Sequence, residues 1–411
     1  MLSHIKILLP ERIFILKSLS GQGVVYDKEE YSIYYKNIIA PYSEDYDIQI
    51  ECQYGMNLGD CWRIDSFETE SDVFDFSLKI YGEEGELLAE KSCIIELLDK
   101  KEHKKTNLLC IGDSMTRAEI YLKHAAEKVT GINTVGIRNI AYGVNHEGRG
   151  GWASYSYFTK KEDTGSGVSP FLFPKGFGGK EYFGSKRFWE NVAEYSENYH
   201  YAGIKPQKIA DGMVCLDDGK LWRYSDGKYK LIDKEPEFEF DFGKYIERYD
   251  IQKPDIVSLL FGANEFQICR YAELDAEIEK YIRTLKDMIE NIRNFDKNIK
   301  IVINMPICGG SQYAWGTQMG CSGTAKQYAF NIKKACSAIL REFDGKSSEG
   351  IFVCPMLAVC DTESGFPYEY KKVNIYSDLE KRECTNWVHP SEVGYKQMGD
   401  AFAAVIAAVI N

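Results

Sequence analysis

The sequence predicts an α/β protein in which a parallel sheet lies between two layers of helices, preceded by a smaller, jelly-roll-like β-sandwich domain. Three observations support this prediction. Short runs of β-forming residues fill positions 1–100, strands alternate with helices from residue 106 onward, and a charged segment at 99–105 separates the two patterns. Alternating strands and helices are typical of a parallel sheet covered on both faces. We therefore expect one domain at 1–100 and a second at 106–411.

The first domain is predicted to consist of six to eight short strands. Their residues alternate in polarity or are branched and aromatic types, which favour a pleated sheet. A Gly-Glu-Glu-Gly turn at 82–85 indicates a hairpin. Several short strands separated by turns are typical of a sandwich. The clearest strands lie at 13–16, 31–35, 46–50, 74–80 and 92–98.

In the second domain each predicted strand is an apolar run and each helix has an apolar stripe. Apolar residues at 278, 282, 285, 289 and 292 follow the four-three spacing of a helix that faces a core. The predicted elements are, in order, strand 108–111, helix 117–129, strand 255–261, helix 278–292, strand 300–304, helix 325–341, strand 351–354 and helix 391–410.

The segment at about 155–250 interrupts this alternation. It is rich in aromatic residues and glycine, and it contains a predicted hairpin at 213–224 with an Asp-Gly turn. Long insertions beside a site are often functional. We consider two roles equally: a lid or substrate wall, and a structural or dimer-contacting arm.

Composition excludes several classes of partner. The formal net charge is −12, which argues against nucleic acid. The twelve cysteines form no Cys-x-x-Cys pair and no zinc-ligand spacing, so we expect no metal or other cofactor. The start lacks a signal-peptide pattern, and the apolar stretch at 401–410 is too short to span a bilayer. We expect a cytoplasmic protein with no membrane partner, secreted only if a signal was removed; a homo-oligomer stays open.

A serine and a distant histidine suggest nucleophilic catalysis. Ser114 follows the predicted strand at 108–111 almost directly, and open α/β sheets build their sites at the carboxyl ends of strands. His389 could supply the base that such a serine needs. The alternative is that Gly112-Asp113-Ser114 only forms a turn and a helix cap, because all three residue types favour those positions.

Four short motifs with potential catalytic residues follow one another along the chain. They are Gly112-Asp113-Ser114, the glycine-rich run 147–152, Gly-Ala-Asn-Glu at 262–265 and Asn-Trp-Val-His-Pro at 386–390. This order resembles the SGNH (GDSL-like) hydrolases, a family of serine esterases named for its conserved Ser, Gly, Asn and His. The resemblance covers residues 106–411 and implies a three-layer α/β/α domain.

The resemblance also implies roles. Ser114 would be the nucleophile and would donate one N–H to the oxyanion, Gly151 a second, with Gly150 as the alternative, and the Asn264 side chain a third. His389 would be the base. Asn264 as a turn cap and the glycines as a plain loop are the competing interpretations. We interpret three further residues as structural: Asp113, His124 and His146.

One position departs from the family pattern. The family usually has Asp three residues before the histidine, where this chain has Asn386. An amide cannot stabilise an imidazolium as a carboxylate does. Either a backbone carbonyl orients His389 in a Ser–His dyad, or another acid replaces the aspartate, or the chain is a weakened or non-catalytic member. The candidate acids are Asp378, Glu383 and Glu392.

The layout of a β-rich module before a hydrolase resembles two-domain carbohydrate O-acetylesterases. We therefore expect hydrolysis of O-acetyl esters on a xylo- or other oligosaccharide through an acyl-enzyme on Ser114. Trp152, Trp315 and Trp387 lie in or near predicted site loops and could bind a sugar ring, line an acyl pocket or fill a core. The rivals are a lipase- or thioesterase-like enzyme, which needs a long apolar tunnel, and a carbohydrate-binding protein with an inactive hydrolase domain.

Overall fold

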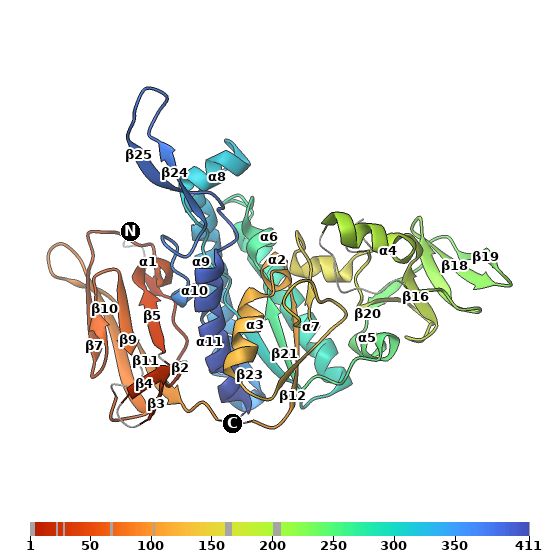
Figure 1. Ribbon diagram of the computed structural model, residues 1–411, viewed down its shortest axis with the longest axis horizontal. Coiled ribbons are helices and arrows are strands. Elements are labelled where there is room, and N and C mark those ends of the chain that lie inside the picture. The colour runs from red at the N-terminus through yellow and green to blue at the C-terminus, as the bar shows by residue number, and fades with distance from the viewer. Residues whose placement is uncertain are drawn as a thin grey trace.

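The computed structural model describes residues 5–21, 24–27, 29–65, 69–101, 103–160, 167–199 and 207–410. In Figure 1 the N-terminal strands lie at one end, the α/β part lies in the middle, and the insertion extends at the opposite end.

The middle of the molecule contains a parallel sheet, as predicted. Five strands follow the order β13-β12-β21-β22-β23, and the short β14 (Glu147–Gly148) pairs with the end of β12. All neighbouring pairs are parallel, and β21 is buried along its whole length, as expected of a strand covered on both faces. The strands are β12 (Thr106–Gly112), β13 (Ile132–Val135), β21 (Ile256–Leu260), β22 (Lys300–Asn304) and β23 (Ile351–Cys354).

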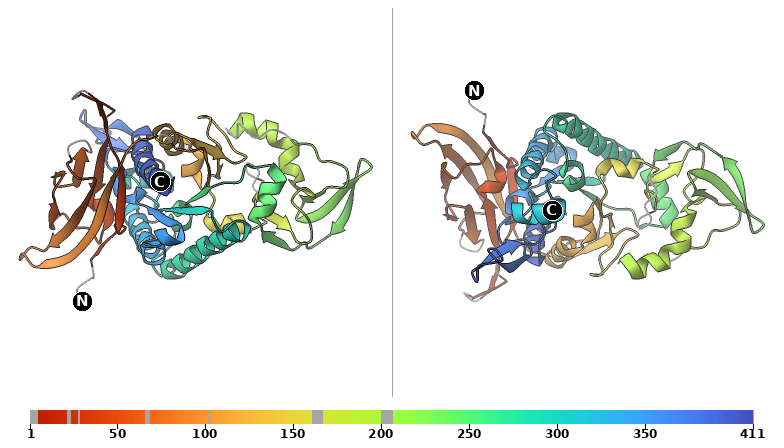
Figure 2. Two further views of the ribbon diagram at one scale, coloured as in Figure 1. Left: turned by 90° about the horizontal axis from the view of Figure 1, so that it is seen from below. Right: turned by 90° about the horizontal axis from the view of Figure 1, so that it is seen from above.

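Helices cover both faces of this sheet. Figure 2 shows α3 (Ile120–Lys128) and α11 (Glu392–Ile410) on one face, and α7 (Leu274–Phe295) and α9 (Ala325–Phe343) on the other. The predicted apolar stripe of α7 is buried at every one of its five positions. The three-layer α/β/α prediction is therefore confirmed for this part of the chain.

The helix predicted at 117–129 is broken. The structure has a short α2 (Ser114–Arg117), and α3 begins only after Glu119, whose φ is +63°. A left-handed conformation is unfavourable for glutamate. It directs the Glu119 carboxylate to the backbone N–H groups of Ile140, Ala141 and Tyr142, which all donate to it. A tertiary contact thus overrides the local helical pattern.

The N-terminal part contains all five strands that the sequence predicts most clearly. One sheet has the order β2-β11-β10-β7, and a second has the order β5-β9-β8. That these sheets form a jelly-roll-like sandwich stays a prediction. The strands are β2 (Arg12–Leu16), β5 (Glu30–Tyr34), β7 (Asp47–Cys52), β8 (Met56–Asn57), β9 (Cys61–Asp65), β10 (Val73–Tyr81) and β11 (Leu87–Leu98), with the small pairs β1 (Lys6–Ile7) with β6 (Ile39–Ala40) and β3 (Leu19–Gly21) with β4 (Val24–Asp27), and with helix α1 (Tyr35–Ile38).

The N-terminal part packs directly on the α/β part. One hydrophobic cluster runs through both, and α11 contacts β2 as well as β23. The buried Asn37 side chain donates to the carbonyl oxygens of Leu357 and Cys360, at 2.9 and 2.7 Å, near α10 (Met356–Val359). Among the described helices α11 is long and apolar enough to cross a membrane, but most of it is buried, as in the core helix of a globular fold.

The insertion forms a small unit with its own apolar cluster. The predicted hairpin is present, and its turn residues Asp218 and Gly219 have φ of +54° and +72°, as a type I′ turn requires. A second hairpin turns at Asp226-Gly227 and was not predicted. The elements are β15 (Leu172–Pro174), β16 (Tyr182–Ser185), α4 (Lys186–Tyr199), β17 (Val214–Asp217), β18 (Lys220–Ser225), β19 (Lys228–Asp233), β20 (Phe238–Phe240) and α5 (Phe242–Tyr249).

One protruding hairpin was also not predicted. β24 (Tyr368–Lys372) and β25 (Glu380–Cys384) project from the body near α8 (Gln312–Met319), as Figure 1 shows. β24 carries two tyrosines among charged residues, and β25 consists of four charged residues and a cysteine, so neither strand has the apolar alternation that predicts a strand.

Candidate active site

Ser114 lies where the sequence predicts it, at the carboxyl end of β12 and the first residue of α2. Asp113 is the N-cap of α2, and its side chain accepts the N–H of Met115 at 2.8 Å, which confirms its structural interpretation. Burial raises the pKa of Asp113 to about 8. A Cβ at Gly112 would lie 2.6 Å from the carbonyl oxygen of Leu260, so only glycine lets β12 approach β21 there.

His389 comes from the far end of the chain and contacts the serine. Its Nε2 lies 2.8 Å from the Oγ of Ser114, which is hydrogen-bond distance. Burial, and then the nearby charge of Arg117, lower the pKa of His389. The imidazole is therefore neutral at neutral pH, which is the form that can accept a proton from a hydroxyl.

Asn386 supports the loop that carries His389. Its Oδ1 accepts the backbone N–H groups of Val388 and His389, at 3.0 and 2.9 Å. This is the contact that a capping side chain makes at a turn. Asn386 therefore positions His389 through the backbone of the loop. Its side-chain oxygen Oδ1 accepts both of these hydrogen bonds.

Within the described ranges no carboxylate forms an ion pair with His389. The three acids considered as replacements each pair with a lysine instead: Asp378 with Lys372, Glu383 with Lys381 and Glu392 with Lys396. None of the three forms a hydrogen bond or ion pair with His389 among the described contacts, so this structure gives the replacement hypotheses no support. The geometry is that of a Ser–His dyad.

The first two residues of the glycine-rich segment 147–152 form strand β14, in which Gly148 pairs with Gly112 of β12. A Cβ at Gly148 would lie 2.4 Å from the backbone nitrogen of Arg117, so this glycine permits close approach of the two segments. The N–H of Gly148 donates to Nδ1 of His146 at 2.9 Å. Among the described residues, nothing accepts the N–H groups of Gly150 and Gly151. Both glycines thus remain candidates for the oxyanion donor.

Asn264 connects the segment 262–265 to the glycine-rich segment 147–152. It lies in α6 (Ala263–Phe266), directly after β21, and its Nδ2 donates to the carbonyl oxygen of Trp152 at 2.9 Å. The buried Glu265 strengthens this junction, because its carboxylate accepts the N–H groups of Gly262 and Ser154, at 3.0 and 2.6 Å. Although Glu265 belongs to the motif at 262–265, no pattern in the sequence predicts its burial or these contacts.

A buried hydrogen bond between neutral His146 and the carboxylate of Glu119 lies behind the Ser114 side of the site. Nε2 of His146 lies 2.9 Å from a carboxylate oxygen of Glu119, and both side chains are fully buried. Because Nδ1 of His146 accepts the N–H of Gly148, the proton is on Nε2 and is donated to Glu119. Burial lowers the pKa of His146. Burial acts to raise the pKa of Glu119, but hydrogen bonds from His146 and three backbone N–H groups lower it overall.

Glu147 forms a second buried junction next to the first. Its carboxylate accepts the N–H of Ile137 at 2.8 Å, the hydroxyl of Tyr245 at 2.7 Å and the guanidinium of Arg149 at 2.8 Å. The Tyr157 hydroxyl donates to the carbonyl oxygen of Gly112 at 2.8 Å. Charged and aromatic side chains thus fix the loop that carries the candidate oxyanion glycines. One of them, Tyr157, belongs to the short helix η1 (Ser154–Phe158).

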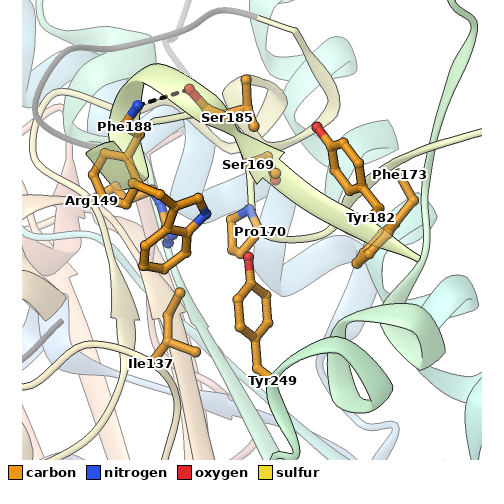
Figure 3. Close-up of a pocket in the computed structure, with 12 residues that line it drawn as sticks. Ile137, Arg149, Ser169, Pro170, Phe173, Tyr182, Ser185, Phe188 and Tyr249 are labelled. Carbon is orange, nitrogen blue, oxygen red and sulfur yellow. Dashed lines mark hydrogen bonds between the residues drawn. The ribbon is translucent and has the colours of Figure 1, made fainter. Parts of the chain in front are cut away.

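Two cavities lie near this machinery. The first has a volume of about 330 Å³ and opens beside the dyad. It is lined by Ser114, Arg117, Ala118, Glu119, Ile140, Ala141, His389 and Tyr395. The second, shown in Figure 3, lies against the buried Arg149 and measures about 20 Å³. That is room for about one water molecule. Of these two cavities, the first is the one with room for a substrate.

The three tryptophans do not form a sugar-binding wall. Trp152, Trp315 and Trp387 are 5%, 1% and 3% exposed, so none offers an open face for stacking. Trp152 packs edge-on against Tyr157, and the rings of Trp315 and Trp387 lie 4.4 Å apart. The predicted substrate role is corrected: these indoles fill the core behind the site loops.

Neither His124 nor any cluster of metal ligands belongs to the site. His124 lies on α3 and pairs with Asp400 at 2.7 Å, in agreement with its structural interpretation. In the part of the chain that the structure describes, no group of His, Cys, Asp and Glu is arranged to hold a metal ion.

Comparison with solved structures finds matches at low identity and low TM-score. A possible lipase from Chitinophaga pinensis is 12% identical, with a TM-score of 0.34, and the match covers 73% of this chain and 97% of that protein. A family 3 carbohydrate esterase from Clostridium thermocellum is 14% identical, with a TM-score of 0.30 and coverage of 74% and 98%. At such scores these similarities carry no argument about activity. No curated protein matches the chain significantly.

Comparison with protein families gives a direct match. The model of the GDSL-like lipase/acylhydrolase family matches residues 185–402, which is more than half of the chain. This span contains Asn264 and His389, whereas Ser114 and the glycine block precede it and are joined to it by the contacts described above. The chain belongs to the GDSL-like lipase/acylhydrolase family.

Proposed function

We propose that this protein is a serine esterase that removes O-acetyl groups, with a carbohydrate as the alcohol. The observation that carries the catalytic part is the 2.8 Å contact between Nε2 of His389 and Oγ of Ser114 at the mouth of a cavity. A serine within hydrogen-bond reach of a neutral histidine is the arrangement of an activated nucleophile.

The reaction proceeds in two halves. Oγ of Ser114 attacks the acetyl carbonyl carbon while Nε2 of His389 takes the hydroxyl proton, and the imidazolium returns this proton to the departing alcohol oxygen as the ester C–O bond breaks. Water then attacks the acetyl-serine, His389 takes one water proton, and acetate leaves as the proton returns to Oγ. The N–H of Ser114, one of the two glycine N–H groups and Asn264 stabilise the oxyanion in each half.

The shape of the cavity supports a small acyl group. Its apolar wall consists of Ala118, Ile140 and Ala141, and its volume of about 330 Å³ is at the low end for small-molecule sites. A lipase- or thioesterase-like reaction on long chains needs a longer apolar channel. A carbohydrate as the alcohol rests on the resemblance to two-domain acetylesterases, and the burial of the three tryptophans removes one argument for it.

An inactive, carbohydrate-binding protein is the second candidate, because Asn386 replaces the family's aspartate. A fluorophosphonate probe distinguishes the two. Covalent labelling of the wild type but not of Ser114→Ala supports the esterase, whereas absence of labelling in both supports the binding protein.

Hydrolysis of p-nitrophenyl esters tests the proposed function. We expect the acetate ester to be hydrolysed faster than the butyrate and octanoate esters. The variant Ser114→Ala should lose at least about 10³-fold in kcat. Acetate release from acetylated xylo-oligosaccharides then tests the alcohol. Equal rates for wild type and Ser114→Ala would reject the esterase, and a preference for octanoate would favour the lipase-like alternative.

A further inference from the structure

We propose that the protruding hairpin β24–β25 joins two copies of this chain, with strand β24 of one copy pairing antiparallel with β24 of the other. The hairpin contributes no residue to the cavity beside the dyad, so this assembly does not depend on the proposed esterase function. As Figure 1 shows, the two strands project from the body of the molecule.

The outer edge of β24 offers backbone hydrogen-bonding groups to another strand. The N–H of Thr385 donates to the carbonyl oxygen of Pro367 at 2.8 Å, and the N–H of Val373 donates to that of Leu379 at 2.9 Å. Because hydrogen-bonded pairs alternate along an antiparallel ladder, the odd-numbered residues of β24 bond to β25, and the even-numbered ones direct their N–H and C=O groups outward. Among the described strands only β25 pairs with β24, and α8 contacts β25. Such an edge is a template for a further strand.

The tip of the hairpin exposes large apolar side chains. Ile375 and Tyr376 are 82% and 92% exposed, and apolar groups gathered at one exposed place mark an interaction site. Aliphatic side chains do not stack on a sugar ring, and the ring of Tyr368 at the hairpin's base is covered by Arg382 at 3.9 Å. The tip therefore fits a protein partner better than a carbohydrate. Its exposed apolar residues are Val373, Ile375, Tyr376 and Leu379.

The charges of β24 identify a second copy of the same strand as this partner. Glu369 and Lys371 lie on one face of β24, 3.2 Å apart. A two-fold axis at Tyr370 places Glu369 of each copy opposite Lys371 of the other, and opposite charges across an antiparallel pair stabilise it. A register shifted by two residues would place Lys371 against Lys371 or Glu369 against Glu369. The strand is thus complementary to itself in one register, as a two-fold interface requires.

The antiparallel arrangement also covers the exposed tip. Because the hairpin projects from the body, the two bodies lie at opposite ends of the shared four-stranded sheet (Figure 1). The tip of each hairpin then lies beside the base of the other. Ile375 is five residues after Tyr370, and Pro367 at the base is three residues before it. At about 3.3 Å per residue, the tip reaches roughly 7 Å past the base and onto the body of the other copy.

Two charge variants and their mixture test the proposal. Glu369→Lys and Lys371→Glu each place like charges across the strand pair twice, whereas in the mixture a basic β24 faces an acidic one. Tyr370→Pro removes an outward N–H and leaves the hairpin's own hydrogen bonds intact. The control is Lys230→Glu, a charge reversal on β19, the exposed edge strand of the insertion. Sedimentation equilibrium measures the mass, which is 47.0 kDa for one chain, and melting temperatures check that each variant is folded.

We expect the wild type to have the mass of two chains at micromolar concentration, and Tyr370→Pro that of one. Each single charge variant should raise the dissociation constant of the dimer by at least about tenfold, and the mixture should return to within about threefold of the wild type. Lys230→Glu should change nothing. A monomeric wild type, a dimer that these variants leave unchanged, or a mixture that associates no more tightly than its two components would each overturn the proposal.

Discussion

The two halves of the active site are built in different ways. On the Ser114 side, two buried carboxylates hold the neighbouring loops. Glu119 accepts hydrogen bonds from three backbone N–H groups and from His146. Glu147 accepts them from a backbone N–H, a tyrosine and an arginine. On the His389 side, the amide of Asn386 holds the loop by two hydrogen bonds. The loops beside the proposed nucleophile are thus held by charged side chains, whereas the loop of the proposed base is held by a neutral one. The comparison predicts that substitutions on the two sides damage different properties.

The largest effect is expected at the base itself. His389→Ala removes the only group within hydrogen-bond distance of the Ser114 hydroxyl in the described structure. We expect kcat for p-nitrophenyl acetate to fall by on the order of 10⁴–10⁶. The melting temperature should change little, because His389 is only partly buried and carries no ion pair. A fall below tenfold would mean that another group acts as the base.

The next largest effect should fall on stability and come from the Ser114 side. Glu119→Gln replaces a buried carboxylate by an amide whose NH₂ faces donors, so we expect a loss of about 1–3 kcal/mol in the free energy of unfolding, as for buried donors left without an acceptor. Thermal and urea denaturation measure it. Glu127→Gln, on the surface of α3, is the matched control. An unchanged midpoint would show that the network does not stabilise the fold.

A smaller effect is expected at Asn386. Asn386→Ala leaves the N–H groups of Val388 and His389 without their acceptor, so we expect the free energy of unfolding to fall by about 1 kcal/mol and kcat to fall because His389 is less well positioned. Asn386→Asp retains an acceptor and adds a negative charge that favours the imidazolium. Its acid limb in the kcat/KM profile should therefore move to higher pH. If Asp and Ala behave alike, capping by this side chain does not position the base.

The smallest effect is a shift of the pH profile in Arg117→Gln. The charged groups that line the cavity with His389 are Arg117 and Glu119, and Tyr395 is the remaining titratable side chain there. Because burial, and then the charge of Arg117, lower the pKa of His389, wild-type activity should rise with pH through a midpoint below 6.5, the ordinary value for histidine. Removing the cation should move this midpoint upward for a neutral ester. A downward movement, or none, would show that the charge does not act on the base.

Much of the fold follows from local patterns, whereas the support of the site does not. The stripe of α7 and the apolar run of β12 identify buried elements directly, and the order of four short motifs brings Ser114, Asn264 and His389 to one region. Glu119 has no such signal. A charged residue at the start of a predicted helix is expected to face water, and its burial depends on N–H groups about twenty residues later in the chain.

The three tryptophans show that side-chain exposure is also not predicted by the sequence. Trp152, Trp315 and Trp387 occur in loops near the motifs, and the sequence does not tell whether an indole in such a loop faces solvent or the core. The structure buries all three. Residue type and position along the chain identify the chemistry of Ser114 and His389, but exposure is decided by segments that pack from elsewhere.

The placement of α11 has a consequence for how this protein can be divided. The helix begins at Glu392, shortly after His389, and is covered by β2 of the N-terminal part on one side and by the parallel sheet on the other. A helix that is apolar around most of its circumference is not stable in water. Deleting residues 1–98 would expose one side of α11, so we expect the remaining fragment to aggregate and to lose its activity. The N-terminal part thus completes the cover of the helix that follows His389, and a usable expression fragment has to contain both parts.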